Sequence, residues 1–97
     1  MVIGLTSSKV TPEQGRVVED FLADFLPRLK AEQPGVVAVY HFTDIEAGEE
    51  VTAIVWEDEA ARVAYRQSEL IKEALVLERR LGLASRREAY PLTVALH

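Results

Sequence analysis

The stretch VTAIVWEDEAA, from Val51 to Ala61, decides the fold prediction because it is apolar on both sides of an extended chain. Successive side chains of a strand point to opposite faces. One face would carry small aliphatic residues, Val51, Ala53 and Val55. The other face would carry Thr52, Ile54 and Trp56. Neither face is suited to water, so each needs a cover, and the acidic residues after Trp56 favour the start of a helix.

Length and composition limit the protein to one modest core. The chain has 97 residues, of which 48% are hydrophobic, and a formal charge of −5. These values predict a single globular domain over residues 1–97. No basic run exceeds an Arg pair, so we expect no nucleic-acid partner. Without cysteine, disulfides, thiol catalysis and thiolate metal sites are excluded.

The sequence also lacks the features of a membrane or secreted protein. The start, MVIGLTSSKV, has neither a positively charged region nor a long apolar one, as a signal peptide would. No segment reaches the roughly 18 consecutive apolar residues that a membrane span requires. We therefore expect a cytoplasmic protein with no membrane partner.

Hydrophobic periodicity predicts four strands and two helical regions. The predicted strands are Met1 to Ser7, Val36 to Thr43, Val51 to Trp56, and Arg87 to Leu96. Pro91 lacks a backbone donor, which favours a sheet edge for the last strand. The helical regions lie between the first and second strands and between the third and fourth.

The helix boundaries follow from capping residues. Thr11 caps the first helix in a capping-box spacing, and Pro27 should kink that helix or end its regular part. Asp58 caps the second region and Ser68 a further helical piece within it. Gly82 is suited to end this piece in the left-handed conformation.

The resulting order, βαββαβ, is that of an α+β, ferredoxin-like fold. Both helical regions would cover one face of a four-stranded antiparallel sheet. The other face would then expose a continuous apolar surface, which monomers rarely do beyond a few hundred Å². We therefore expect a homodimer in which a second copy of the chain covers this face.

Several segments together resemble the antibiotic biosynthesis monooxygenase-like family. They are QPGVVAVYHF, the strand that ends in Trp56, the acidic and alanine-rich EDEAARVAYRQSE, and the closing YPLTVAL. The resemblance spans nearly the whole chain. It implies a dimeric α+β barrel in which each subunit has a ligand cavity between helices and sheet.

The branches of this family imply different chemistry. The haem-degrading branch has an Asn near the first strand, a Trp in the second helix and an axial His after it. This chain has no Asn, and it carries Tyr65 in place of the Trp and Leu75 in place of the His. We therefore expect no haem, no other cofactor and no metal. The branch that oxidises phenols without a cofactor has a Trp that Trp56 matches, but Thr52 replaces its Asn.

Five residues are candidates for binding a ligand, and each has an ordinary structural alternative. Trp56 is either a packing residue or a pocket wall, and Tyr65 either packs simply or faces the same cavity. Thr52 shares the strand face of Trp56. Phe21 and Phe25 would meet Trp56 beneath the helices. We predict that Trp56 lies between sheet and helices, at the mouth of a mostly apolar pocket.

Charged and titratable residues give weaker indications. His41 is a candidate general base, although a lone histidine near the end of a strand is usually exposed. Glu57 and Asp58 suit the start of a helix. Four arginines near the end of the second helical region suit a helix C-terminus and solvent, or alternatively an anion site: Arg79, Arg80, Arg86 and Arg87.

Two functions remain open. The first is a cofactor-independent monooxygenase acting on a small aromatic, phenolic or quinone-like molecule. The second is a non-catalytic, homodimeric module that binds a ligand or partner on the same barrel. A closed cavity beside Trp56, with more than one polar group directed into it, would favour the enzyme.

Overall fold

The computed structural model describes residues 1–94 and 96, which form four strands and three helices. The strands are β1 (Val2–Lys9), β2 (Val36–Asp44), β3 (Glu49–Trp56) and β4 (Ser85–Pro91). The helices are α1 (Pro12–Glu32), α2 (Glu59–Arg66) and α3 (Glu69–Leu81). In this part of the chain, no helix is both long and apolar enough to cross a membrane.

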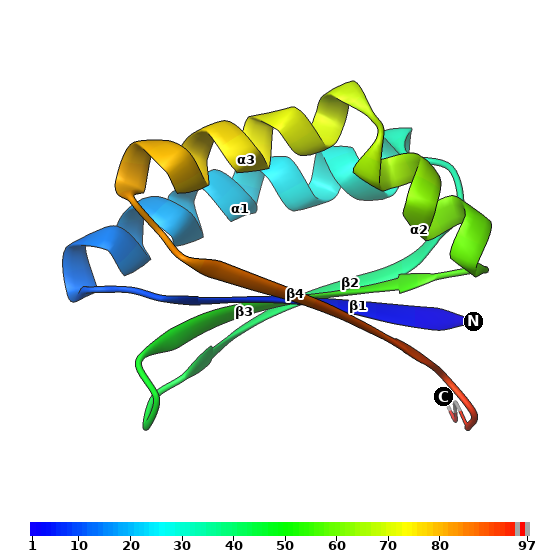
Figure 1. The fold of residues 1–97 in the computed structure, drawn as a ribbon, viewed down its shortest axis with the longest axis horizontal. Coiled ribbons are helices and arrows are strands. Elements are labelled where there is room, and N and C mark those ends of the chain that lie inside the picture. The colour runs from blue at the N-terminus through cyan, green and yellow to red at the C-terminus, as the bar shows by residue number, and fades with distance from the viewer. Residues whose placement is uncertain (95, 97) are drawn as a thin grey trace.

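The strands form one antiparallel sheet in the order β2-β3-β1-β4, and the helices lie together on one of its faces (Figure 1). The predicted ferredoxin-like βαββαβ fold is therefore confirmed. Two contacts hold α1 antiparallel to α3. Arg28 Nη2 lies 2.6 Å from Glu73 Oε2, and Gln14 Nε2 donates a hydrogen bond of 3.0 Å to the carbonyl of Leu81.

The predicted caps are present, whereas α1 does not end at Pro27, one of the two outcomes expected there. Thr11 forms a reciprocal capping box with Gln14, and Asp58 and Ser68 accept hydrogen bonds from the first turns of α2 and α3. Gly82 ends α3 with φ +68°. Pro27 lies inside α1, which continues to Glu32. Buried Phe25 and Leu29 anchor the helix on both sides of Pro27, so packing maintains the helix despite the lost hydrogen bond.

The last strand is shorter than the sequence predicts and begins earlier. β4 pairs with β1 from Ser85, opposite Ser8, to Pro91, opposite Val2, and beyond this pair Leu92 N donates one hydrogen bond of 2.9 Å to the carbonyl of Met1. The predicted continuation to Leu96 is wrong for residues 92–94 and 96, while Ala95 and His97 lie outside the described residues. Pro91 is on an edge strand, as predicted.

The register gives the sheet two different faces. On the helix side, Ile54 and Trp56 belong to the buried core with Phe25, Leu29 and Tyr65. We call the other side the open face; it is formed by Ile3, Leu5, Tyr40, Phe42, Val51, Ala53, Val55 and Tyr90.

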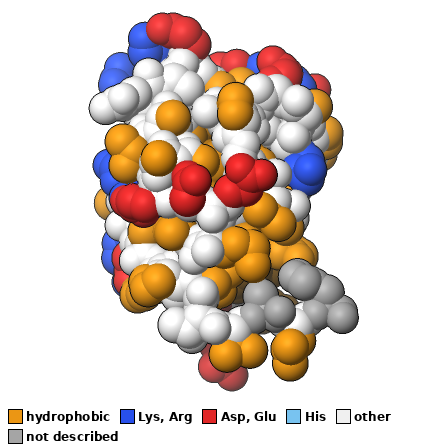
Figure 2. All heavy atoms as spheres, turned by 90° about the vertical axis from the view of Figure 1, so that its right-hand side faces the viewer, with side chains coloured by type: hydrophobic (Ala, Val, Ile, Leu, Met, Phe, Trp, Pro, Cys, Tyr) orange, Lys and Arg blue, Asp and Glu red, His pale blue; other side chains and the backbone are white. Residues whose placement is uncertain are grey.

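The open face carries large aromatic side chains that no described element covers. Tyr40 is 55% exposed and Phe42 is 51% exposed. Figure 2 views the molecule from one end, and hydrophobic side chains gather in its lower half, on the side of the sheet away from the helices. The homodimer predicted from this surface stays a prediction.

Candidate functional site

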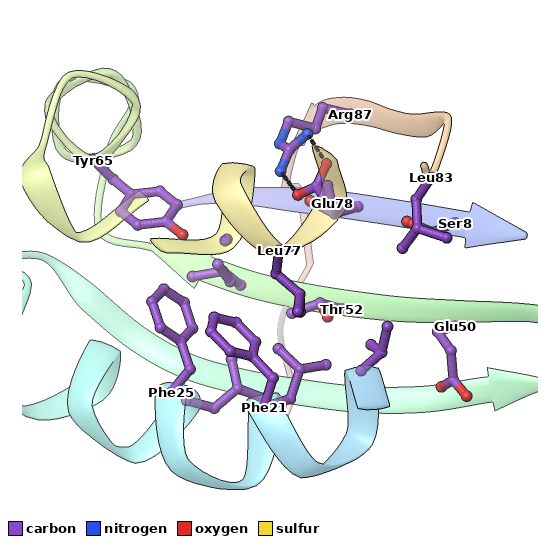
Figure 3. A pocket seen from close by; sticks show the side chains of 16 residues that line it. Ser8, Phe21, Phe25, Glu50, Thr52, Tyr65, Leu77, Glu78, Leu83 and Arg87 are labelled. Atoms are coloured by element: carbon purple, nitrogen blue, oxygen red, sulfur yellow. Dashed lines mark hydrogen bonds and ion pairs between the residues drawn. The ribbon is translucent and has the colours of Figure 1, made fainter. Parts of the chain in front are cut away.

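A cavity lies between the helix side of the sheet and helices α1 and α3, and we call it the main cavity (Figure 3). It encloses about 650 Å³ including its open mouth, of which about 80 Å³ can hold the centre of a water molecule. In Figure 3, Tyr65 lies at one end of the main cavity and Glu50 and Ser8 at the other. The space therefore has an aromatic end and a polar end.

Two aromatic rings of α1 form the floor of the main cavity. Phe21 and Phe25 are one helical turn apart, which puts them on the same face of the helix. Their ring centroids are 4.9 Å apart and their planes differ by 20°. Leu22, Leu26 and Leu77 add aliphatic surface to the walls. A flat apolar molecule would bury its faces here.

The polar end of the main cavity is formed by Glu50, which is only 6% exposed. Thr43 Oγ1 donates a hydrogen bond of 3.0 Å to Glu50 Oε2, and His41 Nε2 lies 2.7 Å from the same oxygen. The contact with His41 is close but poorly aligned, because Nε2 lacks a partner along its N–H direction. On the α1 side of Glu50, a Cβ on Gly15 would lie 3.2 Å from Oε1, so the glycine leaves room for the carboxylate.

Further polar groups line the side of the main cavity formed by β1, β4 and α3. Arg87 binds Glu78 in a two-point ion pair, with Nη1 2.9 Å from Oε1 and Nη2 in contact with Oε2. Ser8 and Ser85 share a hydrogen bond of 2.6 Å across β1 and β4. Arg87 thus neutralises Glu78. The other carboxylate that lines the main cavity is Glu50, at its polar end.

Trp56 lines a second, smaller cavity instead of the main one. This small cavity lies beside Gly4, Tyr65 and Ile71, with about 40 Å³ open to the centre of a water molecule. Trp56 is 1% exposed, which confirms the predicted position between sheet and helices, and it borders a mostly apolar cavity as predicted, although from a buried position. The indole Nε1 points toward Gly4, whose missing Cβ would lie 3.6 Å from it.

Tyr65 lines both cavities and packs against Trp56, with ring centroids 5.2 Å apart. Burial raises the pKa of its hydroxyl to about 12; the positive charge of Arg87 opposes this shift, while Glu78 and Glu73 add to it. The hydroxyl points into the main cavity in Figure 3. Tyr65 therefore stays protonated near neutral pH and can donate a hydrogen bond to a ligand.

The structure brings together most of the predicted site residues. Phe21, Phe25, Thr52 and Tyr65 surround the main cavity. His41 is not among the residues that line either cavity, but it contacts Glu50, which lines the main one. The ligand-binding and catalytic roles assigned to these residues stay predictions.

Glu50 is not among the site residues predicted from the sequence, because the third strand was expected to begin at Val51. The strand begins at Glu49, and strict alternation then puts Glu50 on the same face as Thr52. A carboxylate on the helix side of a strand was the signal that could have identified it.

The four arginines do not form one anion site. Arg79 and Arg80 lie in the last turn of α3, where cations suit the helix C-terminus. Arg86 and Arg87 are adjacent in β4 and point to opposite faces, Arg86 lying near Glu49 and Glu88. Among residues 1–94 and 96, no three His, Cys, Asp or Glu side chains are grouped as metal ligands would be.

Solved structures of small proteins share this fold closely. A candidate antibiotic biosynthesis monooxygenase from Deinococcus radiodurans matches with a TM-score of 0.86 and 15% identity, over 100% of this chain and 97% of that one. A protein of unknown function from Nitrosomonas europaea, NE2512, matches with a TM-score of 0.77 and 22% identity, over 99% of this chain and 92% of that one. At these identities the likeness shows the fold alone.

A third structure has a known type of activity. SnoaB from Streptomyces nogalater, a cofactor-independent oxygenase, matches with a TM-score of 0.72 and 20% identity, over 98% of this chain and 95% of that one. A comparison with curated proteins found no match.

The family model for antibiotic biosynthesis monooxygenases matches residues 1–76. This range contains β1 to α2 and most of α3, and therefore Glu50, Thr52, Trp56 and Tyr65. Since the model covers more than half of the sequence, the chain belongs to the antibiotic biosynthesis monooxygenase family.

Proposed function

We propose that the protein is a cofactor-independent oxygenase that binds a small phenolic or quinone-like molecule in the main cavity. The observation that supports this most is the combination of an apolar floor, Phe21 and Phe25, with polar groups at both ends of one space. A planar ring would lie against the two phenylalanines. Its oxygen substituents would meet Thr52, Tyr65 or Glu50.

The proposed reaction needs no added reductant. When a phenol is converted to a quinone by one molecule of oxygen, one oxygen atom enters the ring and the other leaves as water with the two hydrogens that the phenol loses. The phenol supplies all four electrons that reduce the oxygen molecule. The protein's part would be to hold the ring in a dry space and to stabilise the developing charge.

We also propose that the active form is a homodimer joined through the open face. Tyr40 and Phe42 present aromatic surface there, beside the small residues Ala53 and Val55. Small side chains allow two sheets to approach to about 10 Å, the usual separation of packed sheets. The cavities lie on the opposite face, so each subunit would retain its own.

A second candidate function is a non-catalytic module that binds the same kind of molecule. The burial of Trp56 favours this alternative, because the indole does not reach the main cavity and so cannot contact a ligand there. In this case the ring would bind without reacting with oxygen.

The two functions are separated by measuring turnover and binding of 1-naphthol in variants of α3. Ala74→Trp would fill the main cavity, whereas Val76→Trp introduces the same side chain at a position 52% exposed. The oxygenase predicts naphthoquinone containing one atom from labelled oxygen gas, formed by the parent protein and Val76→Trp but not by Ala74→Trp.

If 1-naphthol binds but no naphthoquinone forms, and only Ala74→Trp loses the binding, the result would support the non-catalytic module instead. If the parent protein neither binds nor converts 1-naphthol or a related quinol, both candidate functions are wrong.

A further inference from the structure

We infer that Glu50 is the hydrogen-bond acceptor that selects and orients the ligand, which places a ligand hydroxyl at the polar end of the main cavity, away from Trp56. This inference rests on the proposed function, since it requires that a ring molecule occupies the main cavity. It specifies the end of the main cavity at which the ligand hydroxyl binds. It also specifies the preferred class of ring molecule, which is one with a neutral O–H or N–H donor.

The first step is that Glu50 is largely buried, and that among the described residues its polar contacts fall on one of its two oxygens. Its side chain is 94% removed from solvent, given an exposure of 6%. Thr43 and His41 both contact Oε2. Oε1 lies on the α1 side, next to Gly15, and the carboxylate borders the main cavity. A carboxylate accepts several hydrogen bonds, so Glu50 has acceptor capacity left for a donor that enters the main cavity.

The second step is that the cavity around Glu50 offers it few other donors. Most neighbouring side chains in the main cavity are apolar, among them Val18, Phe21 and Leu22. Ser8 is bonded to Ser85, and Arg87 is bonded to Glu78. The hydroxyls of Thr6 and Thr52 also line the cavity, and a ligand hydroxyl would compete with them for Glu50 once the ligand displaces water.

The third step concerns the sign of charge. A ligand carboxylate or phenolate directed at Glu50 would bring two negative charges together in an apolar space, which is unfavourable. A neutral hydroxyl instead forms a hydrogen bond to a charged group, the stronger class of such bonds. The site should therefore prefer a neutral hydroxylated ring to both its methyl ether and its carboxylate analogue.

His41 acts in this arrangement as a positioning residue. Its Nε2 lies 2.7 Å from Oε2, and His41 is not among the residues that line the main cavity, so it would act on the ligand only through Glu50. Thr43 Oγ1 hydrogen-bonds Oε2 and His41 Nε2 contacts the same oxygen, so both occupy Oε2 and leave Oε1 for the main cavity. In this arrangement His41 supports Glu50, and the role of general base expected for it from the sequence stays a prediction.

The test compares three probes by calorimetry in the absence of oxygen: 1-naphthol, 1-methoxynaphthalene and 1-naphthoate. The parent protein should bind 1-naphthol about tenfold or more tightly than either of the others, the usual effect of a hydrogen bond to a charged group. Glu50→Gln should reduce this preference to about threefold or less, because it removes the charge.

Glu49→Gln is the matched control, since Glu49 is the neighbouring carboxylate on the opposite face of β3, near Arg86. It should keep the full preference. His41→Gln, which retains a donor, should also keep the preference, whereas His41→Leu should lower it while the melting temperature of both variants stays similar.

The outcomes separate this inference from the proposed function. Equal binding of 1-naphthol and its methyl ether, blocked in both cases by Ala74→Trp, would overturn the role of Glu50 but leave the proposed function intact. Tightest binding of 1-naphthoate would likewise overturn it and indicate Arg87 as the partner.

Two further results bear on the same inference. Loss of the preference in Thr52→Val, with Glu50→Gln unaffected, would show that Thr52 is the acceptor and that the inference is wrong. Failure of all three probes to bind would overturn both proposals. If Glu50→Gln does not fold, the probe comparison in the parent protein and the two His41 variants still decides the question.

Discussion

The rings of Trp56 and Tyr65 pack against each other at a tilt of 33°, which joins the end of β3 to α2. Tyr65 also borders the main cavity, whereas Trp56 does not. Trp56 therefore influences the proposed ligand site only through the ring that it supports. Its first role is structural, in the core of the sheet–helix interface.

Replacing Trp56 by alanine should cost substantial stability. Because its side chain is 1% exposed, Trp56→Ala should lower the free energy of unfolding by about 3–5 kcal/mol, from lost burial and the cavity left behind. Val76→Ala, on the exposed side of α3, should change it by only about 0.5 kcal/mol. Urea unfolding measures both, and equal effects would contradict the placement of Trp56.

Replacement by alanine should change the stability of the protein in opposite directions at two glycines. At Gly4 a Cβ would lie 3.6 Å from Trp56 Nε1, an ordinary contact beside the small cavity, so Gly4→Ala should raise stability by about 0.4–1 kcal/mol. At Gly35, φ is +85° and the Cβ would lie 2.4 Å from that of Ala61. Gly35→Ala should therefore lose at least about 2 kcal/mol.

Gly48 separates the two causes of the loss at Gly35. Its φ is +66°, but a Cβ there would meet no atom within 4 Å. Gly48→Ala should lose about 1–2 kcal/mol, from backbone conformation alone. Thermal unfolding gives all three values, and a loss at Gly35 no greater than that at Gly48 would remove the contact with Ala61 from the explanation.

Tyr65 should make the protein less stable in strong alkali. Its pKa is raised from 10.0 to about 12 in the folded chain, so the folded state keeps a proton that the unfolded state has lost. The free energy of unfolding is therefore unaffected below pH 10 and should fall by roughly 2–3 kcal/mol as the pH rises through 12.

Tyr65→Phe cannot lose this proton and should flatten the alkaline part of the stability curve. Unfolding at a series of pH values, compared between the parent protein and this variant, measures the difference. Identical alkaline slopes would show that Tyr65 titrates like an exposed tyrosine.

The proposed dimer is best tested at exposed positions of the open face. Ala53 and Val51 are already buried within one chain, so a charge there would disturb folding as well as assembly. Phe42→Asp places a charge on the open face at a residue 51% exposed, and it should convert a dimer to a folded monomer. Val76→Asp is the control. Sedimentation giving a monomer for the parent protein would end the dimer proposal.

The sequence predicted the fold well because its signals were local. Thr11, Asp58, Ser68 and Gly82 mark helix ends through backbone chemistry that needs no tertiary contact. Alternation in β3 likewise placed Ile54 and Trp56 on the helix side. The errors concern where elements end: α1 continues past Pro27, where packing on both sides maintains the helix, and β4 ends at Pro91 instead of Leu96.

The candidate site was harder to predict because its residues meet across the chain. Phe21, Thr52 and Tyr65 belong to three elements, and a shared face was their only common signal in the sequence. The contact between His41 and Glu50 depends on the pairing of β2 with β3, in which His41 lies opposite Thr52 and diagonal to Glu50. No spacing along the chain specifies that register.

The central claim, that a ring molecule binds in the main cavity, can be tested directly with the three phenylalanines of the chain. Phe21 and Phe25 line the main cavity and Phe42 lies on the open face, so the protein contains its own control. Fluorine NMR of protein labelled with fluorophenylalanine, titrated with 1-naphthol without oxygen, measures all three. We predict that the Phe21 and Phe25 signals shift together while that of Phe42 stays unchanged; a shift of Phe42 alone would contradict the account.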